Sequence, residues 1–249
     1  MRRALQVLRV LGKNHANGMS VKEVMTATGL ERSTAHRLLK CLAEEHFADQ
    51  HPNTRRYRLG LEIMQLGFAS LSRAPLMNVY SLFLRRLARL TDEAVFLIVR
   101  QGDYSVCLQR EEGTVPAEMI VTRVGHVYPL GVGIGGIALL ACASAQEIER
   151  IGRQHRKALE AAGLTMDQFD KVISKSRRVG YIEMTDVVTQ GVVGVGAAIP
   201  NPHGEPFAAI AIASNKSRMP PRRRAALGLA LVDALSHDLQ TFRPSSFMA

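Results

Sequence analysis

Residues 18–42 read GMSVKEVMTATGLERSTAHRLLKCL, and their pattern predicts two short helices joined by a turn at Gly29. Ser20, followed three residues later by Glu23, is typical of a capping box at the start of the first helix. The second helix places its apolar side chains on one face at helical spacing, namely Ala35, Leu38, Leu39 and Leu42. Two helices joined by a glycine turn are typical of a helix-turn-helix, whose second helix enters the major groove of DNA. The alternative for this segment is an ordinary helical hairpin with a solvated polar face.

The flanking segments extend this motif to a winged helix-turn-helix domain over residues 1–60. Residues 2–11 predict a further amphipathic helix, and residues 47–60 predict a two-stranded hairpin, or wing, that carries Arg55, Arg56 and Arg58. Residues 1–60 hold eleven Lys and Arg against five Asp and Glu, so they carry +6 of the chain's net charge of +10. An excess of positive charge at the motif favours binding to the phosphates of a nucleic acid.

The composition of the 249 residues, of which 47% are hydrophobic, indicates one large or two modest domains with real cores. The net charge and a pI near 10.0 favour a polyanionic partner, although basic surfaces also bind membranes. No apolar run approaches the roughly 20 residues of a membrane helix, and no small-residue cleavage site follows the basic N-terminus. We therefore expect a cytoplasmic protein. Cys41, Cys107 and Cys142 fit neither a disulfide framework nor a zinc spacing, so neither a metal nor a cofactor is expected.

The rest of the chain predicts an α+β fold, with a linker helix over residues 61–74 and a second domain over residues 75–243 built on an antiparallel sheet. Periodicity and caps predict helices at residues 77–90, 145–162, 166–179 and 222–239. Short apolar or alternating runs predict strands at residues 94–100, 104–110, 117–122, 192–199 and 207–214.

These residues resemble an IclR-type bacterial transcriptional regulator over nearly the whole length. The motifs that carry the resemblance are Gly29-Leu30, Ser33 to Leu39, Tyr57 to Gly60, Val124-Gly125 with Pro129-Leu130, Arg178 to Tyr181 with Gly191-Val192, and Gly204 to Ala209. The resemblance implies a C-terminal GAF-like domain that binds a small-molecule effector, and an assembly that is a homodimer or a homotetramer. It also implies double-stranded operator DNA as the partner of the N-terminal domain.

The residues expected to contact DNA open or line the second helix of the motif, cap the first helix, or lie on the wing. They are Ser20, Arg32, Ser33, Thr34, His36, Arg37, Lys40, Arg55, Arg56 and Tyr57. Arg can bond guanine bidentately, whereas Ser20 at a helix N-terminus and the wing arginines suit phosphates. Tyr57 has packing of the wing as an equal alternative, and His36 has a simple place on the helix surface.

The loop from Gly131 to Gly136 has the spacing G-x-G-x-x-G of a dinucleotide-binding turn. No parallel βαβ unit surrounds it and Pro129 precedes it, so a nucleotide cofactor is not expected. Backbone N–H groups at the start of a helix can instead hold a carboxylate, and the family places its effector loop here.

This chain departs from the family at the effector site. Where the family has His, Thr and a later Lys, this sequence has Gly131, Gly133 and Ile137. Family members that bind pyruvate or glyoxylate place Asp, Cys and two Ser around the ligand. Ungapped spacing back from Pro206 puts Met184, Gly194, Ala211 and Ala213 at those positions.

A small, strongly hydrated acid would gain few bonds among such side chains, so we expect a larger, more apolar or aromatic organic acid. The expected effector residues are Met119, Gly125, Leu130, Gly131, Val132, Gly133, Ile134, Met184, Asp186, Gly194, Ala211 and Ala213. Asp186 has a surface position as its alternative. The alternative for the whole site is a pocket filled by its own side chains.

The function expected from these features is sequence-specific regulation of transcription, of a catabolic operon, under control of the effector. An enzyme acting on a small organic acid is the first alternative, but no nucleophile elbow, HExxH or paired-carboxylate motif occurs in the sequence. A non-specific nucleic-acid-binding protein is the second alternative.

Overall fold

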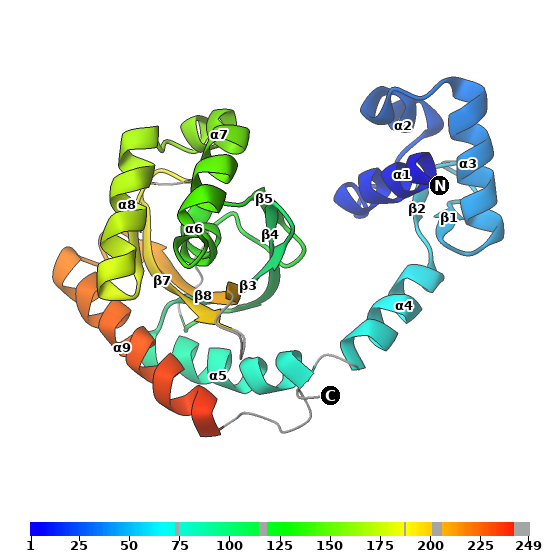
Figure 1. Cartoon of the computed structure of the whole chain (residues 1–249). Helices are drawn as coiled ribbons and strands as arrows, with labels where there is room; N and C mark the ends of the chain where they lie inside the picture. Colours follow the sequence, from blue (N-terminus) through cyan, green and yellow to red (C-terminus); the bar gives the residue numbers. More distant parts are fainter. Residues whose placement is uncertain (73–74, 115–118, 187, 201–205, 242–249) are drawn as a thin grey trace. The chain divides into compact units, whose positions relative to one another are not determined.

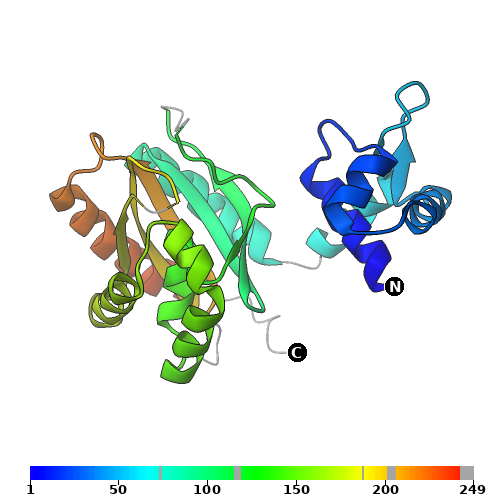
Figure 2. The same cartoon turned by 90° about the horizontal axis from the view of Figure 1, so that it is seen from above.

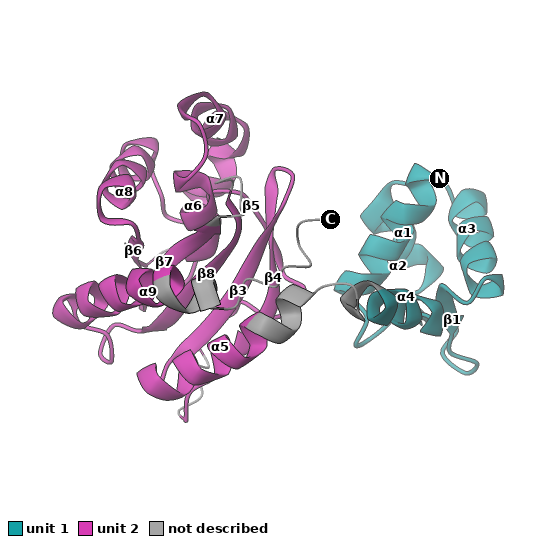
Figure 3. Ribbon diagram, turned by 60° about the horizontal axis from the view of Figure 1, so that its bottom comes forward, with its two compact units in different colours: residues 1–77 teal, residues 78–249 magenta. Residues whose placement is uncertain are grey.

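The computed structural model of the chain divides into two compact units, residues 1–77 and 78–249 (Figures 1 and 3). The structure describes residues 1–72, 75–114, 119–186, 188–200 and 206–241. Each unit has its own apolar core.

Unit 1 is a three-helix bundle with a small hairpin and a further helix. Its elements are α1 (Arg2–Lys13), α2 (Val21–Thr28), α3 (Arg32–Glu44), β1 (Ala48–Gln50), β2 (Tyr57–Leu59) and α4 (Leu61–Ser72). β1 and β2 pair antiparallel, and in Figure 2 the loop that joins them extends beyond the helices of the unit. The core is formed by one apolar face from each helix of the bundle together with the hairpin, and its fully buried members include Val7, Leu11, Val24 and Leu39.

The helix-turn-helix forms because its sequence supplies the caps. The Ser20 side chain accepts a hydrogen bond from the Glu23 amide, and the Glu23 carboxylate accepts one from the Ser20 amide at 2.7 Å. Gly29 ends α2 with a φ of 68°, in the left-handed region that glycine adopts without a steric penalty. The capping box and the glycine turn predicted from the sequence are therefore confirmed.

Unit 2 is an α+β domain on one six-stranded sheet. Its helices are α5 (Pro75–Thr91), which begins just before the unit boundary, α6 (Gly133–Ala141), α7 (Ala145–Ala161), α8 (Met166–Val179) and α9 (Pro221–Thr241). Its strands are β3 (Ala94–Gln101), β4 (Tyr104–Glu111), β5 (Val127–Pro129), β6 (Ile182–Thr185), β7 (Val192–Pro200) and β8 (Pro206–Asn215). The strand order is β5-β4-β3-β8-β7-β6, with every pair antiparallel.

Helices cover both faces of this sheet. Figure 1 shows α6, α7 and α8 on one face and α5 and α9 on the other. The α6 face holds an extensive apolar cluster, in which fully buried side chains such as Ile137, Leu139 and Leu140 come from α6 itself. We call this the effector face, because the residues expected to bind the effector lie on or beside it.

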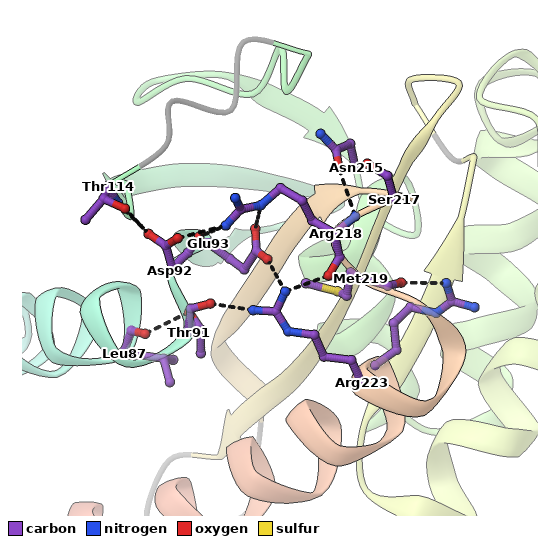
Figure 4. Close-up of polar contacts among 11 residues, drawn as sticks. Leu87, Thr91, Asp92, Glu93, Thr114, Asn215, Ser217, Arg218, Met219 and Arg223 are labelled. Atoms are coloured by element: carbon purple, nitrogen blue, oxygen red, sulfur yellow. Dashed lines mark hydrogen bonds and ion pairs between the residues drawn. The ribbon is translucent and has the colours of Figure 1, made fainter.

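A buried carboxylate joins the two helices of the opposite face (Figure 4). Glu93 is 3% exposed and lies between the end of α5 and β3; it pairs with Arg218 at 3.3 Å and with Arg223 at 2.7 Å. Arg223 also donates to the Thr91 carbonyl at the end of α5, and Arg218 donates to the Asp92 carbonyl, both at 2.6 Å. Arg218, in the turn before α9, and Arg223, in the first turn of α9, therefore hold the C-terminal end of α5.

Two details of the predicted sheet were wrong. Residues 119–122, the described part of the strand expected at 117–122, are not a strand, and the edge strand is instead β5. The carbonyls of Ile120 and Thr122 accept hydrogen bonds from the Arg110 side chain. β6, which pairs with β7, was not predicted. The start of the expected strand, and residues 204–205 of the last motif of the resemblance, lie outside the described residues.

Among the described residues, no helix is long and apolar enough to cross a membrane. Within the same residues, no group of three or more His, Cys, Asp or Glu side chains lies close enough to hold a metal ion.

Candidate DNA interface and effector region

Helix α3 presents a polar face to solvent and an apolar face to the core of unit 1. Ala35 and Leu39 are fully buried, and Leu42 is nearly so. The opposite side carries the side chains expected to read DNA: Arg32, Ser33, His36, Arg37 and Lys40 are exposed and Thr34 is half-buried. The alternation follows from the helical period, and it places three cations and three hydrogen-bonding side chains on one accessible surface.

Ion pairing leaves most of this surface uncompensated. The one salt bridge found on the described α3 joins Lys40 to Glu44 at 3.7 Å, and both side chains are well exposed. An exposed pair of this kind contributes little. The α3 surface is therefore positively charged and open to a polyanion.

Arg56, expected to contact phosphates, is held inside its own domain. Its guanidinium donates to the carbonyls of Asn17 and Gly18 and pairs with Glu23 at 2.8 Å. The Ser20 amide and then Arg56 lower the pKa of Glu23 to about 2. Because Ser20 and Arg56 both bond Glu23, their observed role is to join the start of α2 to the base of the wing.

Tyr57 lies in the core rather than on the outer surface of the wing. It is 4% exposed and exchanges two backbone hydrogen bonds with Met19, at 2.7 and 2.8 Å. This burial supports the packing alternative for Tyr57. The exposed cations of the wing are Arg55, in the loop with a φ of 56°, and Arg58 on β2.

The effector residues on the sheet form two neighbouring rows. In the first, Met184 pairs in register with Gly194, and Gly194 with Ala213. In the second, Gly196 pairs with Ala211. These residues are buried on the effector face, so the sheet offers a floor of small side chains beside Met184.

Ile134, in the first turn of α6, occupies the space above the two glycines. A Cβ atom at Gly194 would lie 2.5 Å from Ile134 Cδ1, and one at Gly196 would lie 2.6 Å from Ile134 Cγ2. The same close approach occurs with the glycine on the helix: a Cβ atom at Gly135 of α6 would lie 2.4 Å from Ile98 of β3. Helix α6 thus packs unusually close to the sheet, and part of the expected site is filled by the chain's own isoleucine.

Two loops meet above this floor. A Cβ atom at Gly191 would lie 3.0 Å from Met119 Cε, and one at Gly133 would lie 3.7 Å from Val188 Cγ2. Val188 has a φ of 69°, which is strained for a β-branched residue. Met119 therefore lies beside Gly191, and Val188 lies beside Gly133 at the start of α6.

Asp186 already has partners in this region. Its carboxylate pairs with Lys216 and accepts a hydrogen bond from the Gly191 amide at 2.7 Å. The Lys216 contact, followed by the Gly191 amide, lowers the pKa of Asp186 below its usual range. The side chain therefore closes the loop between β6 and β7 and joins it to the end of β8.

Four other expected residues lie away from the floor. Leu130 is fully buried, and Gly131 is packed against Phe169 of α8, where a Cβ atom would lie 3.2 Å from Phe169 Cε2. Val132 is also buried, and its amide donates to the Pro129 carbonyl. Gly125 is exposed, and its amide donates to the Cys107 carbonyl. Leu130 and Gly131 thus pack into the core in the segment that leads into α6.

Arg110 lies on the effector face and was missed from the sequence. Simple alternation from Cys107 would turn residue 109 toward this face and Arg110 away from it. The register shifts between Leu97 and Ile98, so Cys107 pairs with Ile98 while Arg110 pairs with Phe96. Ile98 and Phe96 both belong to the effector-face cluster, and directly opposed residues share a face. No local signal in the sequence marks this bulge.

Comparison with known proteins agrees with both units. The chain is 25% identical over 219 residues to the HTH-type transcriptional regulator XynR of Escherichia coli K12, covering 87% of this chain and 86% of that protein. It is 26% identical over 243 residues to the HTH-type transcriptional repressor AllR of the same strain, covering 97% and 89%. It is also 26% identical over 223 residues to the Glycerol operon regulatory protein of Streptomyces coelicolor, covering 88% and 85%.

Solved structures share the fold. The crystal structure of an IclR transcriptional regulator from Alicyclobacillus acidocaldarius superposes with a TM-score of 0.81 at 21% identity, covering 98% of both chains. The Thermotoga maritima IclR gives a TM-score of 0.68 at 20% identity over 97% of both chains.

Two domain families cover most of the sequence. Residues 1–52 match the IclR helix-turn-helix domain, and residues 68–239 match the C-terminal domain of bacterial IclR transcriptional regulators. The chain therefore belongs to the IclR family of DNA-binding transcriptional regulators.

Proposed function

We propose that this regulator binds a specific operator as a homodimer or homotetramer, and that a small, largely apolar organic acid controls the binding. Membership of a family of transcriptional regulators sets the enzyme alternative aside. One relative is named a glycerol operon regulatory protein, and control of a catabolic operon is the corresponding proposal for this chain.

The observation that carries the proposal is the accessible, positively charged face of α3 in unit 1. Arg32 and Arg37 are exposed there beside Ser33 and His36, which suits hydrogen bonding to base edges in the major groove. Arg55 and Arg58 on the wing suit the sugar-phosphate backbone, which positions the protein without specifying the sequence. Arg56 and Tyr57 support the wing from inside.

Selection from a random duplex pool with the full-length protein tests this proposal. The enriched sequence should contain two related half-sites separated by a whole number of helical turns. In competition, unrelated duplex should be at least about 10³-fold weaker than the enriched sequence. Equal competition by every duplex would favour the non-specific nucleic-acid-binding alternative.

The effector class follows from the side chains of the sheet floor. Gly194, Ala211, Ala213 and Met184 offer no side-chain hydrogen bond to a ligand, so a hydrated polar acid would lose water without compensation. An acid with an apolar body gains from the same surface. Because Ile134 occupies part of the floor, we propose that the ligand binds by displacing it or the two loops above it.

A further inference from the structure

The guanidinium of Arg110 shares the effector face with the apolar floor. Arg110 on β4 stands opposite Phe96 on β3, and Phe96 stands opposite Ala211 on β8, which in turn pairs with Gly196 on β7. These four residues form one cross-strand row, so Arg110 lies at the end of the row that contains an expected effector residue.

The guanidinium is well covered. Its side chain is 16% exposed, and its central carbon lies 5.5 Å from the centroid of the Phe96 ring. It donates to the carbonyls of Ile120 at 3.0 Å and Thr122 at 2.7 Å, and it pairs with Glu112 at 2.7 Å. The Glu112 side chain is itself 39% exposed, so this carboxylate partner of Arg110 is accessible to solvent.

A ligand carboxylate can compete with these contacts for the Arg110 guanidinium. Two of its partners are neutral carbonyls, and charge-assisted bonds between a guanidinium and a carboxylate are stronger and often bidentate. The carbonyls belong to segment 119–122, one of the two loops above the floor. An acid that takes their place on Arg110 would release this segment from the sheet.

We infer that Arg110 binds the carboxylate of the effector, whose apolar body then lies along the row of Phe96, Ala211 and Gly196. The inference rests on the proposed effector class, and it replaces the expectation that main-chain N–H groups at the start of α6 hold the acid. The ligand class is a monocarboxylic acid with an aromatic or medium-chain body. In its absence Arg110 holds segment 119–122 and Glu112.

The test compares acids with their neutral amides. Phenylacetate, benzoate and hexanoate, each beside phenylacetamide, benzamide and hexanamide, are titrated into the full-length protein by calorimetry and thermal shift. The variants are Arg110→Gln, Arg110→Lys and Arg100→Gln. Arg100 is the matched control, because it is also a largely buried arginine of the effector face that is paired with a carboxylate, Glu147, away from the row.

The unaltered protein and Arg100→Gln should bind at least one acid about 10-fold or more tightly than its amide. The reason is that the neutral amide cannot form the charge-assisted pair with Arg110. Arg110→Gln should bind acid and amide equally, while its unchanged amide affinity shows that the site is folded. Arg110→Lys should keep a reduced preference for the acid, because a lysine retains the charge and loses the bidentate fork.

Other outcomes overturn the inference in distinguishable ways. If Arg110→Gln retains the full preference for the acid, Arg110 only anchors segment 119–122 and the carboxylate binds elsewhere. If no acid or amide binds the unaltered protein, the proposed effector class fails and the inference fails with it, whereas the operator selection above stays independent.

Glu112→Gln should change the affinity for the acid in the direction opposite to Arg110→Gln. This variant removes the carboxylate that competes for Arg110, so it should raise the affinity for the acid several-fold and leave the amide unchanged. A loss of acid affinity in this variant would mean that Glu112 and the ligand do not share Arg110, which contradicts the inference.

Discussion

Arg37 and Arg55 are both exposed cations of unit 1, but they occupy different elements. Arg37 projects from α3, the helix proposed to enter the groove, so Arg37→Ala should weaken operator binding by roughly 10- to 100-fold and relax specificity. Arg55 lies in the wing loop with a φ of 56°. Arg55→Asn suits that backbone, since Asn tolerates the left-handed region, and it should weaken operator and random duplex alike.

Binding measured from low to moderate salt separates the two roles. A protein that neutralises one phosphate fewer has a slope of log K against log salt that is shallower by about 0.9, so Arg55→Asn should flatten the slope by that amount. Equal losses on operator and random duplex for both variants would contradict the division between base reading and phosphate binding.

The lowered pKa of Glu23 on α2 predicts that the stability of unit 1 depends on pH. Its folded pKa is lowered to about 2, chiefly by the Ser20 amide and then by Arg56. A lowered folded pKa means that the contribution to stability is present above the unfolded value and is lost as the pH falls toward 2. Glu23→Gln should therefore be less stable than the unaltered protein at pH 7, and this difference should shrink as the pH falls from about 4.5 to about 3.

Thermal unfolding and amide exchange at residues 17–25 and 55–59 measure this difference. Glu44→Gln is the control, because Glu44 is exposed and lies 3.7 Å from the equally exposed Lys40. A gap between Glu23→Gln and the unaltered protein that is constant with pH would exclude the charge of Glu23 as its cause.

At the scale of elements, α6 and β7 are fitted together through Ile134 and Gly196. Gly196→Ala would place a Cβ atom 2.6 Å from Ile134 Cγ2, while the nearest backbone oxygen is 3.2 Å away. Overpacking of this kind costs about 1–3 kcal/mol. Ile134→Ala removes the clash, so the double variant should be more stable than the sum of the single effects by about 1 kcal/mol or more.

Urea denaturation of the four proteins in this cycle gives the coupling energy directly. Gly194→Ala supplies the contrast, because a Cβ atom there would also meet the Ile212 carbonyl oxygen at 2.2 Å. Ile134→Ala cannot relieve a clash with backbone, so Gly194→Ala should remain destabilised in the double variant. Additive effects at Gly196 would show that Ile134 moves aside freely.

The joint between α5 and α9 depends on Glu93. Removal of one partner from a fully buried ion pair costs about 3–5 kcal/mol. Arg218 and Arg223 keep side-chain exposures of 30% and 35%, so Glu93→Ala should cost less, about 2–3 kcal/mol in urea denaturation. Glu149→Ala, which breaks an exposed pair with Arg153, should cost under about 0.5 kcal/mol. Equal costs would contradict the structural role of Glu93.

Elements with local caps could be predicted from the sequence. The helix expected at 166–179 coincides with α8, because Thr165 caps its start and Gly180 ends it with a φ of 84°. Two features could not be predicted: the side of the sheet on which Arg110 lies, and the contacts of Arg56 within unit 1. Each depends on partners 10 to 39 residues away. The four residues of β6 are too few to show a period.

At the scale of the whole molecule, the exposed apolar side chains of α4 bear on the proposed assembly. It exposes four large apolar side chains, Leu61, Met64, Leu66 and Phe68, at 50–61%. Exposed apolar side chains gathered on one element mark an interaction surface, and a regulator with one helix-turn-helix per chain needs a second copy to read two half-sites. We propose that α4 pairs with α4 of a second copy.

Met64→Glu with Phe68→Glu tests this pairing, because carboxylates cannot be buried there without a partner. Sedimentation should show a weaker dimer, and affinity for a two-half-site operator should fall at least about 10-fold, while binding to a single half-site stays unchanged because α3 is intact. Leu82→Glu with Leu90→Glu on α5 is the matched control for exposed apolar positions of unit 2. An unchanged dimer in the α4 variant, or an equal loss on one half-site and on two, would mean that α4 does not join the copies and that its apolar side chains serve another contact.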